Sequence, residues 1–415
     1  MPRLRERALY LALISAVARV PGFLIPLLIA AVFGAGQDTD AYFLAYGAVF
    51  LTGGTLAQGI ESAIVHFSAS ARHTQGFEDR AAGTIWWIAV LIWILVVPLV
   101  TIVAPSHLRS RVIVFSLLLT PLAVLWPVCA AYSGGLIARW HIGKASGSML
   151  WRGLGALAGL GGTLLGGGLI AVAAGLAVGE LVRLLWLRGT LVRLFPPGGE
   201  GSAHIPGFGA AASAQVLAGA TGATAPFAER ILATTLGSGG VSLLEYAARL
   251  LVVPAVLFEG GLAPLLLARW SNDLAAGRPP ARRDVMRAVG KGVLLATAIA
   301  AVLALVAPFV VGLLLSRSGM APADVTAVAD LLRLFSIGFV ATMGALLLER
   351  LYLAHAKNRR LAFLALMRVA VRLAVVIAAL SSLGLNAFAT GYAVAEWVYF
   401  VALILYVPRV REATT

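Results

Sequence analysis

The sequence predicts an all-α polytopic membrane protein, and its composition and its recurring apolar runs predict this class. The 415 residues are 60% hydrophobic and only 12% charged, whereas a soluble domain is about half apolar and a quarter charged. Apolar runs of about twenty residues recur along the whole chain, which is the length that an α-helix needs to cross a bilayer. We therefore expect a bundle of transmembrane helices.

We expect about twelve transmembrane helices from the positions of these runs. The boundary between the fifth and the sixth rests only on the glycines from Gly161 to Gly168. The predicted spans run over 8–34, 40–69, 83–104, 110–138, 146–167, 168–188, 206–236, 240–268, 288–316, 325–350, 360–382 and 386–408.

The charges between the apolar runs predict the orientation of the helices. Of the 32 Lys and Arg residues, 22 fall at alternate connections and at the two ends, and three fall at the opposite connections. Cytoplasmic loops carry the excess of Lys and Arg. The asymmetry therefore predicts an even number of spans with both ends cytoplasmic, and it places the "GAGQDTD" turn on the outer side.

An internal repeat divides the chain. With a shift of 203 residues, "VFGAGQDTDAYFLAYGAVF" lies over "TLGSGGVSLLEYAARLLVV", so that Gly34 matches Gly237 and Phe43 matches Tyr246. We expect two six-helix lobes, 1–192 and 210–415, joined by the Pro- and Gly-rich linker 193–209. Because six is even, the lobes are related by a parallel pseudo-two-fold repeat, with a cavity expected between them.

Several classes of function lack their sequence signals. The single cysteine, Cys129, excludes an internal disulfide or a cysteine-based metal site and is expected to be a buried apolar residue. There is no P-loop, no histidine pair at metal-ligand spacing and no catalytic grouping. We expect no enzyme activity, no metal and no cofactor. The net charge of +14 is better explained by topology than by nucleic acid.

Charged residues inside the apolar runs are candidate functional residues, because burying a charge in a bilayer is costly. Arg19 lies beside Pro21 and Gly22, where a kink is expected. Glu245 and Arg249 are four residues apart, the spacing of a helical ion pair. Glu61, Glu229, Arg230, Glu259, Arg333 and Glu396 are further in-span charges; Arg152, Glu349, Arg368 and Arg372 are expected to reach the cytoplasmic interface.

The stretch "ARVPGFLIPLLIAAVFGAGQDTDAYFLAYGAVF" resembles the first two helices of the MurJ/MviN-type lipid II flippases. A second stretch, "ERILATTLGSGGVSLLEYAARLLVVPAVLFEGGLAPLLLARWS", resembles the seventh and eighth helices of that family. The family belongs to the multidrug/oligosaccharidyl-lipid/polysaccharide exporter superfamily. The resemblance implies two lobes around a central cavity, and alternating access that moves a polyprenyl-linked sugar outward.

The resemblance also implies roles for single residues. Arg19 and Arg249 match family arginines, and with Glu245 they are the expected substrate-binding residues. Asp40 matches the aspartate at the outer start of the second helix, where we expect it to cap that helix and to form part of a gate. As charges inside the predicted spans, Glu61 and Glu229 join Asp40 as candidates for a gate or for cation coupling. Coupling is expected to use the membrane potential, Na⁺ or H⁺.

The chain also departs from the family pattern. Family arginines and acids are replaced by uncharged residues, and the two additional C-terminal helices of the family are not expected within twelve spans. The replaced positions are Ile25, Pro26, Gly53, Gly54, Gln58 and Ala248.

These features lead to one main hypothesis and two alternatives. The main hypothesis is a flippase in the bacterial cytoplasmic membrane for lipid II or a related polyprenyl-pyrophosphate-linked glycan. Its expected partners are that lipid, the surrounding membrane lipids and enzymes of cell-envelope synthesis. The alternatives are a drug or small-cation antiporter of the same superfamily, and a degenerate scaffold that recruits wall-synthesis enzymes without transporting anything.

Overall fold

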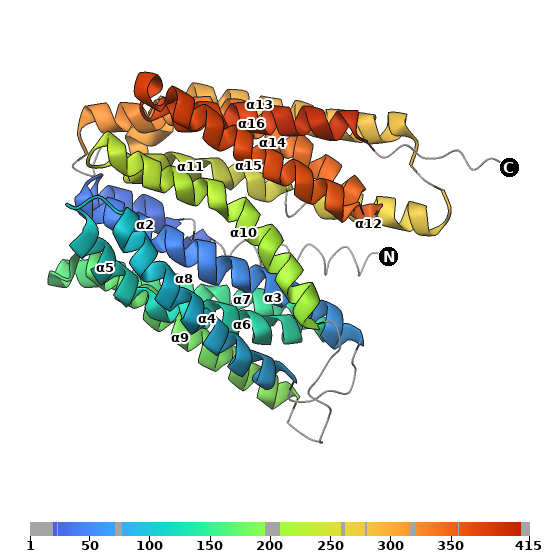
Figure 1. The fold of residues 1–415 in the computed structure, drawn as a ribbon, viewed down its shortest axis with the longest axis horizontal. Coiled ribbons are helices and arrows are strands. Elements are labelled where there is room, and N and C mark those ends of the chain that lie inside the picture. Colours follow the sequence, from blue (N-terminus) through green and yellow to red (C-terminus); the bar gives the residue numbers. More distant parts are fainter. Residues whose placement is uncertain are drawn as a thin grey trace. The chain divides into compact units, whose positions relative to one another are not determined.

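The protein is described by a computed structural model covering residues 20–22, 24–70, 77–195, 208–258, 262–278, 280–315, 320–355 and 357–407 (Figure 1). These residues form helices and short connections, and no strand occurs among them. The chain separates by its internal contacts into two compact units, Met1–Ser242 and Leu243–Thr415. The boundary between these units lies inside the helix Gly240–Leu257, whereas the linker expected from the sequence lies at 193–209.

Among the described residues of the first unit, an apolar helix over Val20–Phe33 comes first in the chain. The helices that follow it are α2 (Gln37–Val49), the π-helix η1 (Phe50–Gly54), α3 (Thr55–Ser70), α4 (Phe77–Val103), α5 (Arg109–Leu118), α6 (Thr120–Ala138), α7 (Ile142–Gly147), α8 (Met149–Gly161), the 3₁₀ turn η2 (Gly162–Leu165), α9 (Gly168–Leu194), α10 (Phe208–Ala233) and the 3₁₀ turn η3 (Thr234–Leu236).

The second unit contains most of α11 and all later helices. These are α11 (Gly240–Leu257), α12 (Ala263–Ala275), α13 (Arg282–Leu315), α14 (Pro322–Ala354), α15 (Asn358–Leu383) and α16 (Asn386–Leu405). Within this unit, α14 packs against α13 and α16, and α15 packs against α16.

The prediction of a multi-pass helical membrane protein is confirmed. Eight helices among the described residues are long and apolar enough to cross a bilayer. Those eight are Gln37–Val65, Phe77–Val103, Arg109–Ala138, Gly168–Leu194, Arg282–Leu315, Pro322–Ala354, Arg359–Leu383 and Asn386–Leu405. The other predicted spans fall on the Val20–Phe33 helix, on α8, on α10 and on α11 with α12, which are shorter or less apolar.

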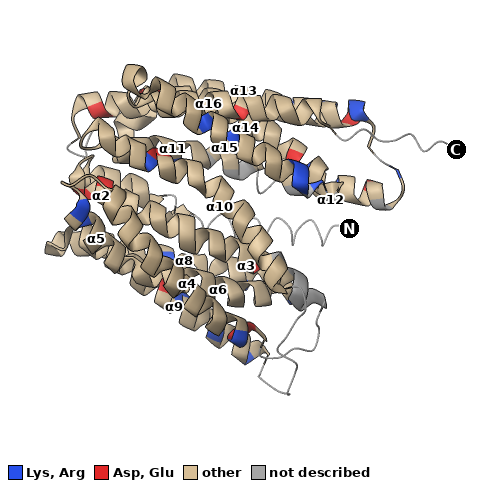
Figure 2. Cartoon of the chain, viewed as in Figure 1, with Lys and Arg blue, Asp and Glu red and all other residues tan. Residues whose placement is uncertain are grey.

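The outward surfaces of the long helices are apolar. Leu95 on α4 is 73% exposed and Leu305 on α13 is 80% exposed. Along the helices most residues are uncharged, as Figure 2 shows. Large aliphatic side chains that are exposed along the length of a helix are unfavourable in water, but they are suited to contact with lipid chains.

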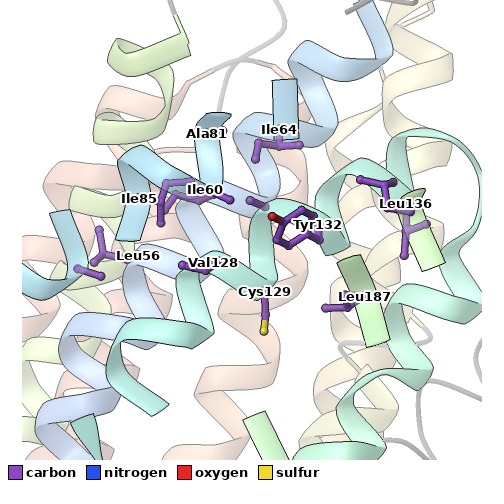
Figure 3. Close-up of a cluster of buried hydrophobic side chains, with 14 of the residues drawn as sticks. Leu56, Ile60, Ile64, Ala81, Ile85, Val128, Cys129, Tyr132, Leu136 and Leu187 are labelled. Carbon is purple, nitrogen blue, oxygen red and sulfur yellow. The ribbon is translucent and has the colours of Figure 1, made fainter. Parts of the chain in front are cut away.

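The core of the first unit lies between α3, α4, α6 and α9. Ile60 and Ile64 of α3 pack with Val128 and Tyr132 of α6 in one buried cluster (Figure 3). Cys129 belongs to this cluster and is completely buried, so the expectation for the cysteine is confirmed. Its thiol lies 3.9 Å from the carbonyl oxygen of Glu180 on α9.

Glycines bring α8 and α9 into close contact. A Cβ on Gly179 would lie 2.6 Å from the carbonyl oxygen of Trp151, and a Cβ on Gly155 would overlap the backbone at Gly175. Small residues allow helix backbones to approach in a membrane protein. Their close approach sets α8 side by side with the charged segment of α9, on which the site described below depends.

The two glycine turns that the repeat aligns have similar backbone features. Gly34 (φ 67°) and Gly237 (φ 101°) both adopt the left-handed region that glycine favours. Each turn precedes a helix with an early aromatic side chain that is buried, Phe43 in α2 and Tyr246 in α11. The likeness of the two segments is local, and the two-lobe repeat stays a prediction.

Candidate functional site

Asp40 does not cap its own helix, which corrects the expectation from the sequence. The N-cap of α2 is Gly36, and Thr39 closes the turn by hydrogen bonds with the backbone of Gly36. Asp40 is therefore inside the first turn, where it is 1% exposed.

The Asp40 carboxylate instead holds the beginning of α11. Its Oδ2 accepts a hydrogen bond from the backbone N–H of Gly239 (2.6 Å). Its Oδ1 accepts hydrogen bonds from the N–H of Ser242 (2.8 Å) and from the Ser242 hydroxyl (2.6 Å). Three donors at the positive end of the α11 dipole point at the two oxygens of Asp40. Residues 200 positions apart are thus joined inside the first unit by one buried side chain.

Two family arginine positions are occupied by glycines at a close helix contact. Gly53 and Gly54 end the π-helix η1, and a Cβ on Gly53 would lie only 2.5 Å from the carbonyl oxygen of Ala123 on α6. Single-turn π-helices often mark functional positions. In this chain the segment carries no charge, and at Gly53 no side chain larger than hydrogen fits without moving α6.

A buried ion cluster joins α8 and α9. Glu180 accepts hydrogen bonds at Oε2 from Arg152 Nε (2.5 Å) and at Oε1 from Arg183 Nη1 (2.9 Å). Arg183 is 1% exposed, and its Nε donates to the Ser148 hydroxyl (3.1 Å). Arg152 was expected to reach the interface, and this is wrong: its side chain is 12% exposed and stacks with Cζ 4.0 Å from the centre of the Trp126 ring.

A cavity borders this cluster within the first unit, with a volume of about 140 Å³. Arg152 is the charged residue among those that line the cavity. The other lining residues are Gly22, Ile25, Pro26, Tyr42, Phe43, Tyr46, Met149, Gly153 and Leu176. Ile25 and Pro26, which stand where the family has charged residues, therefore lie in the wall of this cavity.

Two groups of charged residues in the second unit include charges that the sequence places inside the predicted spans. Glu245 and Arg249 form the predicted ion pair on α11, with 2.7 Å between Oε1 and Nε. A second group joins α14, α15 and α16: Glu349 accepts a hydrogen bond from the Tyr399 hydroxyl (2.9 Å), and Arg368 Nη1 lies 3.6 Å from Glu396 Oε2. That Glu349 and Arg368 reach the cytoplasmic interface stays a prediction, and in the structure both side chains belong to this group.

The remaining predicted site residues are Arg19, Glu61 and Glu229. Arg19 lies outside the described residues. Glu61 is half-buried on α3, and Glu229 is 2% exposed on α10. The neighbour of Glu229, Arg230, lies against Gly47 of α2. Among the described residues, no group of His, Cys, Asp or Glu has the arrangement of a metal site.

Sequence reasoning missed Glu180 and Arg183 as interior charges. The segment "GELVRLL" carries them three residues apart on one helix face, so the signal was present. Arg183 was instead assigned to the basic residues of a cytoplasmic connection, because it lies near the end of a predicted span.

Comparison with known proteins gives a family and a fold. No curated protein matches the sequence. A solved structure described as lipid II flippase MurJ in an inward closed conformation aligns with a TM-score of 0.79 and 16% identity, over 96% of this chain and 86% of that chain. An inward-facing multidrug resistance MATE family transporter of the MOP superfamily aligns with a TM-score of 0.76 and 14% identity, over 95% of this chain and 97% of that chain.

A third solved structure is a MOP superfamily transporter from Pyrococcus furiosus, whose description reports a binding pocket of reversed polarity. It aligns with a TM-score of 0.72 and 15% identity, over 96% of this chain and 94% of that chain. At these identities the structures establish the fold alone. The model of the family described as lipid II flippase MurJ, however, matches residues 136–414 of the sequence, and the chain therefore belongs to the MurJ lipid II flippase family.

Proposed function

We propose that this protein is an alternating-access flippase for a polyprenyl-pyrophosphate-linked glycan precursor, lipid II or a related lipid-linked saccharide, in the bacterial cytoplasmic membrane. The observation that carries the proposal is the family match over residues 136–414. The MurJ-like fold of the whole chain supports it. The lipid-linked substrate is the expected partner, and enzymes of cell-envelope synthesis that make or use it are expected to act nearby.

In the proposed mechanism Arg19 and Arg249 bind the pyrophosphate, and Glu245 orients the Arg249 guanidinium. Arginine suits this role because its planar fork forms two parallel hydrogen bonds to a phosphate and keeps its charge in a medium of low dielectric constant. The Glu245–Arg249 pair joins the Glu245 carboxylate to Nε and to one terminal nitrogen of the guanidinium.

Asp40 is the proposed outer gate. Its three hydrogen bonds fix the start of α11 to α2, and their loss would free the glycine turn at Gly237 and Gly239. Glu61 and Glu229 remain the proposed cation- or proton-coupling residues. Moving one charge across a potential of 100 mV contributes about 2.3 kcal/mol, so one or two charges can bias a two-state transporter.

We propose the topology expected from the sequence: twelve spans in two six-helix lobes, 1–192 and 210–415, with linker 193–209 and both ends in the cytoplasm. Cys129 is the single cysteine, so Cys129→Ala gives a background for labelling. A membrane-impermeant maleimide should label Ser106→Cys from outside the cell and Gly277→Cys only after the cytoplasmic side is opened. The reverse pattern would reject the proposed orientation.

The function is tested by reconstituting the purified protein in liposomes and measuring the translocation of fluorescent lipid II. Arg249→Gln should abolish translocation while the protein still reconstitutes, and so should Arg19→Ala. The matched control is Arg333→Gln. Arg333 is another arginine on a helix of the second unit, and it pairs with Asp330, three residues away. Translocation by both Arg249→Gln and Arg19→Ala at the wild-type rate would contradict the assigned roles.

A small-cation or drug antiporter is the second candidate. The observation in its favour is that the chain aligns over 97% of a MATE transporter but 86% of a MurJ structure. It predicts ion-driven export of a cationic dye from the same liposomes, with no movement of lipid II. Export of the dye without lipid II translocation would replace the flippase proposal.

A further inference from the structure

Arg152 has a hydrogen-bond donor that the protein does not use. Its Nε donates to Glu180, and its Cζ lies over the Trp126 ring. Its Nη2 is buried and has no hydrogen-bond partner among the described residues. An unpaired buried donor of a charged group is costly, so a group that accepts from Nη2 would be bound favourably.

The cavity beside Arg152 has the size and the walls for such a group. Its volume of about 140 Å³ is several times the ~10–15 Å³ that one water-sized group requires. Tyr42 and Tyr46 line one side, and their rings are stacked with centres 6.1 Å apart. Ile25, Pro26 and Leu176 line it with apolar surface. One strong donor within apolar walls suits an anion that carries a hydrocarbon chain.

The charge balance of the cluster also favours an anion. Two arginines, Arg152 and Arg183, share the single carboxylate of Glu180. Arg183 is held on its other side by the neutral Ser148 hydroxyl. The cluster therefore carries one excess positive charge in a buried region, and a phosphate oxygen at Arg152 Nη2 would compensate that charge.

We propose that this cavity is a binding subsite for the phosphate group of an isoprenyl phosphate or pyrophosphate, with Arg152 as the residue that binds it and Glu180 as the residue that positions Arg152. The proposal rests on the proposed flippase function and adds a residue and a place of binding in the first unit. Trp126 and Glu180 fix the guanidinium from two sides in the wall of the cavity.

The test measures equilibrium binding of radiolabelled farnesyl pyrophosphate to the full-length protein in nanodiscs. Arg152→Gln should weaken binding at least roughly tenfold, because it removes a charge-assisted hydrogen bond. Arg139→Gln is the matched control, since Arg139 also pairs with a buried carboxylate, Glu78, and also lies over an aromatic ring, Phe195. It should change the dissociation constant less than twofold.

A second pair of variants leaves the ion cluster intact. Ile25→Phe extends the cavity wall into the space for the ligand and should weaken binding about tenfold, whereas Leu95→Phe on the exposed surface of α4, which does not line the cavity, should bind like the wild type. Thermal unfolding of each variant identifies those that have lost the fold. Wild-type affinity in both Arg152→Gln and Ile25→Phe would overturn the proposal, as would failure of the wild type to bind farnesyl pyrophosphate.

Competing ligands distinguish the sources of the phosphate. Farnesol should compete at least tenfold more weakly than farnesyl pyrophosphate, and equal competition would reject an anion site. Competition by inorganic pyrophosphate as strong as that of the farnesyl ester would retain the anion site but assign it to free phosphate compounds.

Lipid II translocation is measured in the same variants. Normal translocation by Arg152→Gln would reject this subsite but would leave the proposed flippase function intact. If binding depends on Arg152 but the wild-type protein does not translocate lipid II, the subsite is retained and the flippase function is rejected.

Discussion

The two compact units bury carboxylates in different ways. In the first unit, Glu180 has both oxygens hydrogen-bonded to arginines, and Asp40 has three hydrogen bonds. In the second unit, Glu396 Oε2 is buried without a hydrogen bond among the described residues, and its nearest charged partner, Arg368, is 3.6 Å away. Buried polar atoms without a hydrogen bond among the described residues occur in both units, Ser116 Oγ and Arg152 Nη2 in the first and Arg350 Nε and Glu396 Oε2 in the second, but Glu396 Oε2 is the carboxylate oxygen among them.

This difference separates two uses of buried charge. A carboxylate with every oxygen paired fixes the helices around it, because removing it would leave its arginines uncompensated. A carboxylate with an unused oxygen contributes less to the fold and remains available to a cation or a proton. The same substitution, Glu to Gln, should consequently have unequal effects at Glu180 and at Glu396.

The largest effect is expected for Glu180→Gln. The amide keeps the shape of the side chain but removes the charge that both Arg152 and Arg183 contact. Breaking a buried pair in this way costs about 3–5 kcal/mol. The measurement is the free energy of unfolding by titration with denaturing detergent, followed by tryptophan fluorescence. A change below about 1 kcal/mol would show that the arginines find other partners.

Asp40→Asn should have the second largest effect, about 1–2 kcal/mol, because the neutral side chain is a weaker acceptor for the N–H groups at the start of α11. The fully buried Val241 reports the local opening. In the Cys129→Ala background, Val241→Cys should be labelled by maleimide faster when Asp40→Asn is also present. An unchanged labelling rate would indicate that Asp40 does not hold this turn.

The sequence predicted two kinds of feature. One is the long apolar helices that a bilayer requires, and the other is contacts and turns among residues that are close along the chain. Long apolar helices follow from the need to satisfy the backbone within a membrane, and Leu95 and Leu305 show the expected lipid-facing surface. The Glu245–Arg249 pair followed from one turn of helix. The glycine turn at Gly34 followed from its residues. Each of these depends on a few neighbouring positions.

Contacts between distant segments could not be predicted in the same way. Arg152 and Glu180 are 28 residues apart on different helices, and their contact depends on glycine packing between α8 and α9. Asp40 contacts residues about 200 positions away. Apolar periodicity does not fix which helix lies next to which. Asp40 was therefore expected to cap its own helix, and Glu180 was given no role.

A smaller effect is expected for Tyr399→Phe in the second unit. The substitution removes the hydroxyl that donates to Glu349 Oε1 at 2.9 Å, while the ring stays beside Arg368, whose Cζ lies 4.8 Å from the ring centre. A hydrogen bond to a charged group contributes about 1.5 kcal/mol. The free energy of unfolding should fall by about that amount. A loss as large as that of Glu180→Gln would show that the second unit depends on its carboxylates as strongly as the first.

Glu396→Gln should have the smallest effect, within about 1 kcal/mol in either direction. The buried charge of Glu396 has one distant partner and an oxygen with no hydrogen bond, so the desolvation cost recovered on neutralisation offsets the attraction lost. Measured beside Glu180→Gln in the same titration, it compares one substitution at two buried sites. If Glu396→Gln destabilises by 3–5 kcal/mol as well, burial alone governs the cost and the number of hydrogen bonds does not. If it is neutral, the pairing of each oxygen is what separates the structural carboxylate of the first unit from the available carboxylate of the second.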